Sequence, residues 1–293
     1  MIWNWSQLSS RCLNLMFFYC GIVEMRVAGP GAVSESSNTE PGLKVVHLSK
    51  SYGYVPALSD VTLSVGAGEV RGLLGPNGSG KSTLMKIAVG LLKPTSGSVQ
   101  LLGVDVEQNP MTVKKIVGYV PESPRLYEFL TATEYLDFIG DVRGLGFDEK
   151  KTRIERFIDS LDLEGKEGYL ISSYSQGMKQ KVAIMAALLH KPRFLVLDEP
   201  LNGLDPKSAR VIKELLHELA REGVSTIFST HVLEIAQAIC DRITILQNGQ
   251  IIAEGTPDEL RQKAGLPGSG LEDVFMKLTG TSGVEEIVRA LVR

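Results

Sequence analysis

The sequence has few of the residues that build metal sites and disulfide frameworks, and it has no excess of charge of one sign. Its 293 residues include three cysteines and four histidines, and no two cysteines form a Cys-x-x-Cys pair. We therefore expect neither a zinc site nor a disulfide framework, as is typical of a reducing compartment. The 31 Lys and Arg residues are balanced by 34 Asp and Glu residues, which argues against general binding of nucleic acid through a basic surface.

The chain also lacks an apolar run of the roughly 20 residues that a membrane-spanning helix needs. Residues 12–23 (CLNLMFFYCGIV) are strongly apolar but shorter than that, and a Gly-, Ser- and Pro-rich stretch begins after them at Met25. Three interpretations of residues 1–24 stay open: an over-extended start with true initiation at Met25, which we favour, an interfacial anchor, or a signal peptide. We assign residues 1–42 to an N-terminal extension and flexible linker.

From Leu43 onward, short β-like runs alternate with longer helical patterns. This alternation predicts an α/β domain with a mainly parallel sheet. Strands are expected at 43–53, 61–65, 69–75, 116–120, 194–198 and 225–230, with a last hairpin that turns at Asn248–Gly249. Helices are expected at 81–92, 131–143, 148–160, 176–190 and 207–221, and an amphipathic pattern at 284–293 favours a helix that packs on the core.

The residues between the strand at 69–75 and the following helix satisfy the pattern G-x-x-x-x-G-K-[ST]. Glycines let the backbone N–H groups of such a loop surround a phosphate, and the start of a helix adds the positive end of its dipole. Lys81 is expected to neutralise the β and γ phosphates, and the hydroxyl of Ser82 to ligate magnesium. The alternative is a Gly-rich turn with a solvated lysine. The predicted nucleotide-binding run is Gly75, Pro76, Asn77, Gly78, Ser79, Gly80, Lys81, Ser82 and Thr83.

The apolar strand at 194–198 ends in two carboxylates, Asp198 and Glu199, followed by Pro200. In open α/β sheets, ligands bind at the carboxyl ends of the strands. Because successive side chains of a strand point in opposite directions, the two acids are expected to have different roles. Asp198 would hold magnesium through its outer shell, and Glu199 would polarise a water in line with the γ phosphate. Taken alone, the pair is equally compatible with two acids in a surface turn.

In the order of its motifs, the chain resembles the ATP-binding-cassette (ABC) ATPases over about residues 43–260. The family signature, usually LSGGQ, is similar to YSQGM at 174–178, LNGLDP at 201–206 resembles the D-loop, and STH at 229–231 resembles the switch-histidine segment. Each segment alone has an ordinary structural explanation, but their common order makes coincidence negligible. The resemblance implies adenine stacking on Tyr52, nucleotide contacts from Ser175, Gly177 and Asp205, and a catalytic role for His231 beside Glu199.

Two positions depart from the family's pattern. Glu122 stands where a glutamine is usual, and so brings a further carboxylate, a possible metal ligand, to the expected magnesium site. Gln176 replaces the first glycine of the signature. In both departures and in the run GMKQK, the chain resembles the ATPase subunits of ABC-2 type exporters.

The resemblance implies a RecA-like parallel-sheet core, an N-terminal antiparallel β subdomain, a helical signature subdomain at about 121–181 and a C-terminal helical tail at 261–293. Because one chain has one phosphate loop and one signature, two ATPase subunits, as a homodimer or heterodimer, would sandwich two ATP molecules with Mg²⁺ in a head-to-tail dimer. The alternative class is a soluble ABC ATPase that acts on the ribosome or DNA. The ribosomal class normally has two cassettes and the DNA-repair class a long coiled coil, and this sequence has neither.

For a transporter subunit, the resemblance implies ATP hydrolysis coupled to transport by a separately encoded transmembrane permease, on the cytoplasmic face of the cell membrane. The family places the permease's coupling helix just after Glu122, so that residues 125–130 are expected to contribute to a docking groove. Tyr127 and Phe129 are the better interface candidates, whereas Leu136 and Ile139, at helical spacing, are expected to pack inside the helical lobe.

Overall fold

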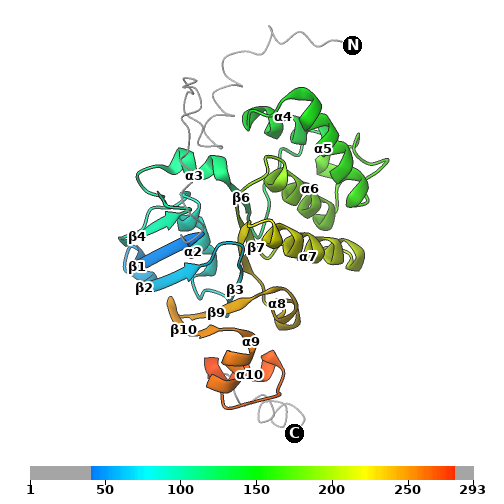
Figure 1. Ribbon diagram of the computed structural model, residues 1–293. Helices are drawn as coiled ribbons and strands as arrows, with labels where there is room; N and C mark the ends of the chain where they lie inside the picture. Colours follow the sequence, from blue (N-terminus) through cyan, green and yellow to red (C-terminus); the bar gives the residue numbers. More distant parts are fainter. Residues whose placement is uncertain (1–40, 281–293) are drawn as a thin grey trace. The chain divides into compact units, whose positions relative to one another are not determined.

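The computed structural model describes residues 41–280, and its elements are labelled in Figure 1. The expectations for residues 1–24, for the linker up to residue 40 and for the helix at 284–293 lie outside the described residues.

A six-stranded sheet forms the centre of the fold, in the order β10-β9-β3-β8-β7-β6. Neighbouring strands are parallel except for β10, which pairs antiparallel with β9. The strands are β3 (Val70–Leu74), β6 (Val117–Val120), β7 (Phe194–Asp198), β8 (Ser225–Ser229), β9 (Arg242–Gln247) and β10 (Gln250–Gly255). All residues of β3, β7 and β8 are buried, as expected for parallel strands that are covered on both faces.

A second sheet is four-stranded and antiparallel, in the order β2-β1-β4-β5. Its strands are β1 (Leu43–Tyr52), β2 (Val55–Val65), β4 (Ser96–Leu101) and β5 (Val104–Asp105). Leu43, Val45 and Leu48 of β1 are fully buried, so that one face of this sheet belongs to the core.

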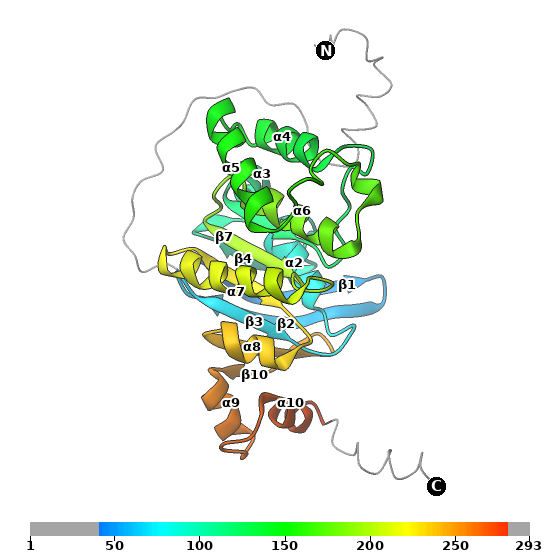
Figure 2. The ribbon, with the colours of Figure 1, turned by 90° about the vertical axis from the view of Figure 1, so that its right-hand side faces the viewer.

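The alternation of side chains along β7 divides the core into two clusters. Phe194 and Val196 pack on one side with α2 (Lys81–Ala88) and the antiparallel sheet. Leu195 and Leu197 pack on the other side with α6 (Gln176–Leu188) and α7 (Pro206–Arg221). In Figure 2, α7 lies in front of the sheet, and α4 (Ala132–Val142) and α5 (Phe147–Ser160) lie above α6, on the side away from β10.

Helices α4 to α7 occupy the four ranges expected between residues 131 and 221, with ends that differ by one or two residues. The expected strand at 116–120 begins one residue later, because Ile116 ends α3 (Pro110–Ile116). The sequence reasoning missed the helices α3 and α8 (Leu233–Ile239) and the strands β4 and β5. The helix α10 (Leu271–Thr279) lies within the helical tail expected at 261–293, and α9 (Pro257–Lys263) begins before that range.

The predicted boundary at residue 260 falls inside α9. Leu260 of α9 and Val274 of α10 are fully buried in the cluster that also contains Leu195. Residues up to Thr279 therefore pack on the main domain, and the division into domains stays a prediction.

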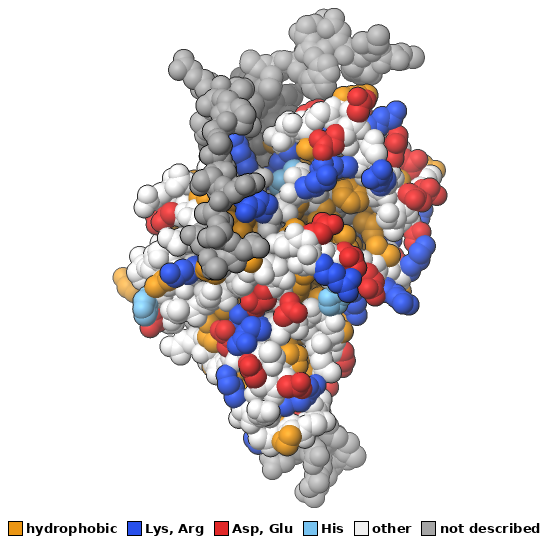
Figure 3. Space-filling view, in the orientation of Figure 1, with side chains coloured by type: hydrophobic (Ala, Val, Ile, Leu, Met, Phe, Trp, Pro, Cys, Tyr) orange, Lys and Arg blue, Asp and Glu red, His pale blue; other side chains and the backbone are white. Residues whose placement is uncertain are grey.

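Charged side chains of both signs are interspersed over the described part of the face shown in Figure 3. A mixed surface creates only a weak field at a distance. Attraction of an anionic ligand to this face would therefore depend on local groups.

Candidate functional site

The loop at 75–83, here called the phosphate loop, connects the end of β3 to the start of α2. A Cβ atom on Gly75 would overlap the carbonyl oxygen of Leu246. A Cβ on Gly80 would lie 2.6 Å from the carbonyl oxygen of Ala57, and the φ of Gly80 is +106°. Both positions therefore require glycine, for lack of space and, at Gly80, for its backbone conformation.

Lys81 lies over this loop, with its Nζ donating to the carbonyl oxygens of Gly75 at 2.7 Å and Pro76 at 3.1 Å. Burial lowers the pKa of the Lys81 ammonium, and the carboxylates of Glu199, Asp198 and Glu122 act in the opposite direction. The structure thus brings together the lysine and three acids that come from three separate parts of the sequence.

Ser79 gives the loop a further polar group. Its side chain is 2% exposed, and its Oγ has no hydrogen-bond partner. A buried hydroxyl without a partner is costly unless a ligand or water completes it. The closely packed glycines, the lysine and this hydroxyl fit the phosphates of a nucleotide.

Asp198 and Glu199 lie at the carboxyl end of β7 and are both buried. Oδ1 of Asp198 accepts a hydrogen bond from the Oγ of Ser229 at 2.6 Å, and the same Oγ accepts the backbone N–H of Glu199 at 2.9 Å. Glu199 has a φ of +51°, which is uncommon for a residue other than glycine. The two carboxylates have different partners, because Glu199 Oε2 lies 3.0 Å from Nδ1 of the exposed His231.

Two polar residues of this region were missed by sequence reasoning. The Tyr119 hydroxyl is buried without a partner, and its pKa is raised by burial and by the charge of Asp198. The side chain of Gln180, 1% exposed, donates from Nε2 to the carbonyl oxygen of Pro200 at 3.1 Å. Only the pairing of β6 with β7 and the packing of α6 bring these residues to the acids.

A magnesium ion at this site would need oxygen ligands. No group of three or more His, Cys, Asp or Glu side chains that could hold a metal occurs between residues 41 and 280. Mg²⁺ characteristically keeps waters and binds through one or two carboxylates together with phosphate oxygens. The half-buried Ser82, the buried Asp198 and the exposed Glu122 fit an ion of this kind.

The signature-like segment lies at the start of α6. Ser175 caps this helix by accepting the N–H of Met178 at 3.3 Å. A Cβ on Gly177 would overlap the carbonyl oxygen of Gly203, so that α6 packs directly against residues 201–206. In the described part of the chain, no hydrogen bond joins Ser175 to the phosphate loop.

Asp205 is engaged within its own chain. It caps α7 by accepting the N–H of Ser208 at 2.9 Å, and its Oδ2 lies 2.8 Å from Nζ of Lys181. The hydrogen bond from Lys181, with those from Ser208, holds the pKa of the Asp205 carboxyl well below its usual range. Lys181, which sequence reasoning did not single out, thereby links the signature helix to the D-loop-like segment.

Tyr52 ends β1 with half of its surface exposed, and Nζ of Lys50 lies 5.4 Å from the centre of its ring. The exposed ring is available for stacking on an aromatic ligand.

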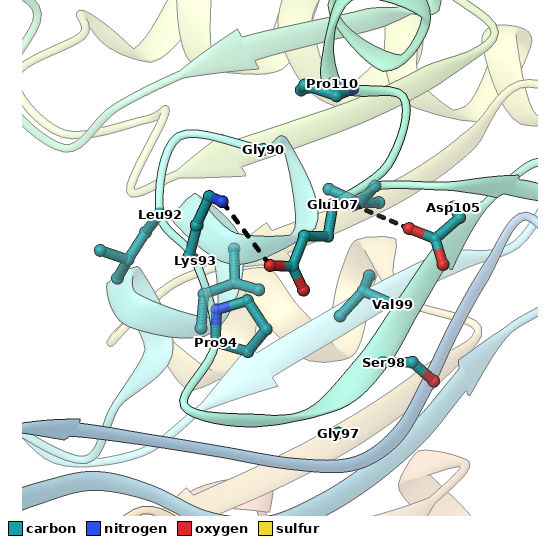
Figure 4. Close-up of a pocket in the computed structure, with 12 residues that line it drawn as sticks. Gly90, Leu92, Lys93, Pro94, Gly97, Ser98, Val99, Asp105, Glu107 and Pro110 are labelled. Atoms are coloured by element: carbon teal, nitrogen blue, oxygen red, sulfur yellow. Dashed lines mark hydrogen bonds and ion pairs between the residues drawn. The ribbon is translucent and has the colours of Figure 1, made fainter.

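A separate cavity of about 100 Å³ lies at the other end of α2 (Figure 4). It is bordered by an ion pair between Lys93 and Glu107, 3.7 Å apart, and the side chains of both residues are exposed. Gly90, Pro94 and Val99 are among its other lining residues. The phosphate loop begins the same helix at Lys81, so that the two sites are distinct.

Comparison with known proteins decides the family. The family model described as "ABC transporter" matches residues 58–202. The linearmycin resistance ATP-binding protein LnrL of Bacillus subtilis (strain 168) is 35% identical over 251 residues, which cover 86% of this chain and 78% of that protein. The chain belongs to the ABC transporter ATP-binding proteins.

Solved structures of this ABC family have the same fold. A structure described as the ATP binding subunit of an ABC transporter has a TM-score of 0.77 at 37% identity and covers 81% of this chain and 99% of its own. A dimeric post-hydrolysis state of the ATP-binding cassette MJ0796, bound to ADP and Pi, has a TM-score of 0.68 at 27% identity. The match covers 73% of this chain and 98% of the MJ0796 chain. The expected ABC ATPase fold is thus confirmed. Among residues 41–280, no helix is long and apolar enough to cross a membrane.

Proposed function

We propose that this ABC protein hydrolyses ATP as a head-to-tail dimer and powers an ABC-2 type exporter through a separate permease at the cytoplasmic face of the cell membrane. The observation that carries the proposal is the close-packed phosphate loop, with glycine required at positions 75 and 80 and with the Lys81 ammonium held over its carbonyl oxygens. The charges of the buried Asp198 and Glu199 act on this ammonium. Such a loop, with a lysine and acids at the ends of parallel strands, is suited to phosphoryl transfer from a nucleotide.

Each group at the site has a proposed task. The phosphate loop and Lys81 bind the phosphates, and Tyr52 stacks on the adenine. Ser82 and Asp198, with Glu122, would hold the magnesium ion, which when bound neutralises charge on the β and γ phosphates. Glu199 orients and polarises the attacking water, and its neighbour His231 lies within hydrogen-bonding distance to assist.

Dimerisation would complete the site with Ser175 and Gly177 of a second subunit. In one chain these residues lie at the start of α6, where Gly177 packs on Gly203. The D-loop-like segment and the signature therefore form one surface that can face a partner's γ phosphate, with Asp205 beside it. The similar MJ0796 cassette is dimeric with ADP and Pi bound, which supports a dimer. Differential binding of ATP to the closed dimer would convert hydrolysis into motion.

The permease is proposed to dock on residues 125–130, here called the docking segment. Phe129 is 69% exposed, and its ring stacks on that of Tyr127 with centroids 5.9 Å apart. Leu136 is fully buried and Ile139 packs against the core, as expected for residues inside the helical lobe. Phe129 is therefore the stronger anchor candidate for a partner helix.

The docking segment is bonded directly to the signature region. Nζ of Lys179, in α6, lies 2.6 Å from Oε1 of Glu128, and the carbonyl oxygen of Glu128 accepts the N–H of Ser172 at 2.9 Å. A displacement of the docking segment would thus move α6, the helix that Ser175 caps.

The exporter assignment rests on Glu122, Gln176 and the GMKQK run, and the resistance function in the name of LnrL supports it. The cargo would be recognised by the permease, so that this chain supplies only the ATPase.

Glu199→Gln tests the proposed reaction. The amide keeps the shape of the side chain but loses the base, so that ATP turnover should fall about 100-fold or more while ATP binding is retained. With ATP and Mg²⁺, the variant should accumulate as a dimer in analytical ultracentrifugation. Glu222→Gln, an exposed acid at the end of α7, is the matched control and should hydrolyse ATP normally. Wild-type turnover in Glu199→Gln would refute the role of Glu199, and an ATP-bound monomer would refute the dimer.

A further inference from the structure

Ser229, the last residue of β8, contacts the side chain of one acid of the site and the backbone of the other. It is 0% exposed. Its hydroxyl donates to Oδ1 of Asp198 at 2.6 Å and accepts the backbone N–H of Glu199 at 2.9 Å. One small side chain thus contacts both residues to which the proposed function gives separate tasks.

This position follows from the register of the sheet. Asp198 and Ser229 are paired residues of the parallel strands β7 and β8. Paired residues of neighbouring strands point to the same face, so that the serine hydroxyl meets the carboxylate without any distortion of either strand. The pairing of β7 with β8 places this serine opposite the aspartate, and the separate sequence motifs do not predict that pairing.

The hydroxyl also restrains an unusual backbone. Glu199 has a φ of +51°, a conformation that costs free energy in a residue with a side chain. Ser229 accepts the N–H of Glu199 itself, and Gln180 donates to the carbonyl oxygen of the next residue, Pro200. The peptide group before Glu199 and the one after Pro200 are therefore held by residues of other elements.

We propose that Ser229 is a positioning residue that orients the Asp198 carboxylate toward the magnesium ion and the Glu199 carboxylate toward the attacking water. This inference rests on the proposed ATPase function. The hydrogen bond to Oδ1 restricts rotation of the Asp198 carboxylate, as hydrogen-bond partners of metal ligands commonly do. The hydrogen bond from the Glu199 N–H fixes the start of the turn that carries the proposed base.

The same strand offers a matched control. Ser225, the first residue of β8, is also 0% exposed, and its Oγ accepts a hydrogen bond from the N–H of Gly68 at 3.0 Å. Ser225→Ala removes the same hydroxyl from the opposite end of the strand, with equal burial and with no contact to the two acids. A loss of function that is confined to Ser229→Ala thus cannot come from deleting a buried serine as such.

The experiment compares wild type, Ser229→Ala, Ser229→Cys and Ser225→Ala. Equilibrium binding of a fluorescent ATP analogue is measured with EDTA and with Mg²⁺, and the ratio of the two affinities gives the magnesium-dependent gain. Steady-state ATPase kinetics give kcat and KM, and thermal unfolding reports the folded state. Binding of the ATP analogue in EDTA does not depend on turnover or on the metal. It therefore distinguishes a variant that no longer binds the nucleotide from one in which only the positioning of the magnesium ligands is disturbed.

In both Ser229 variants we expect the magnesium-dependent gain and kcat to fall about 10- to 100-fold, the range for removing a hydrogen-bond partner of a metal ligand. Affinity in EDTA should stay within about twofold of wild type, as for Ser225→Ala. A Ser229→Ala protein with the same magnesium-dependent gain in affinity and the same kcat as Ser225→Ala would overturn the inference.

If Ser229→Ala does not fold, Ser229→Cys, with a side chain of similar shape but a weak donor, decides in its place. A folded cysteine variant with wild-type gain and kcat would overturn the inference equally. Failure of the proposed function is distinguishable, because the wild-type protein itself would then hydrolyse no ATP.

Discussion

Replacing Lys81 by alanine should weaken ATP binding strongly, and the structure indicates how much. The Lys81 ammonium is held by two loop carbonyls at 2.7 and 3.1 Å, and the charges of Glu199, Asp198 and Glu122 act on it. A hydrogen bond that involves a charged group contributes about 1.5–3 kcal/mol. Its loss corresponds to about a 10- to 150-fold higher Kd.

Because of the three acids, we expect the increase in Kd to lie toward the upper end of this range. Lys81→Ala removes the positive charge on which these acids act, so that their repulsion of the ATP phosphates is no longer offset by a lysine at this position. We therefore expect the Kd for ATP to rise about 100-fold in Lys81→Ala.

Isothermal titration calorimetry with ATP checks this expectation. Lys86→Ala is the matched control, because Lys86 is an exposed lysine on the same helix, five positions after Lys81. The control should change the Kd by no more than about twofold. Circular dichroism confirms that both variants are folded. An unchanged Kd in folded Lys81→Ala would refute the assignment of residues 75–83 as the phosphate-binding loop.

Two further predictions concern the helical lobe. Gly177→Ala should cost about 1–3 kcal/mol of unfolding free energy through overlap with the Gly203 carbonyl, and lower the melting temperature by several degrees. Gly146→Ala, where a Cβ meets open space, is its control in the same calorimetric scan, and equal melting temperatures for the two variants would contradict the close packing. Phe129→Asp should keep intrinsic ATPase activity but lose co-purification with the permease, whereas Phe147→Asp, at another exposed phenylalanine, should lose neither. Wild-type recovery of the permease with Phe129→Asp would rule out the docking segment.

Much of the fold was predictable because its signals are local. The ranges of α4 to α7 follow from helical periodicity, and β7 from its apolar run. The hairpin of β9 and β10 turns at Asn248–Gly249 as the dipeptide indicates. Short helices such as α3 and α8 have only seven residues each, too few for a clear periodic pattern. Their formation depends on packing against the sheets, which no short window of sequence contains.

The candidate site likewise has parts that local sequence predicts and parts that it does not. The phosphate loop is one continuous segment, and its glycines and lysine could be recognised by spacing alone. The alternation of a strand also led to the expectation that Asp198 and Glu199 act differently, and in the structure they contact Ser229 and His231 respectively. That expectation stays a prediction until turnover is measured.

By itself, the sequence determined the α/β class, the phosphate loop and the family, because these depend on residues close together or on motifs in a constant order. Only the tertiary structure decided which distant side chains meet: Ser229 with Asp198, Gln180 with Pro200, and Lys181 with Asp205. Strand register and helix packing set those pairs. Both are properties of the whole folded chain, in which burial forces polar groups from separate segments to satisfy one another's hydrogen bonds.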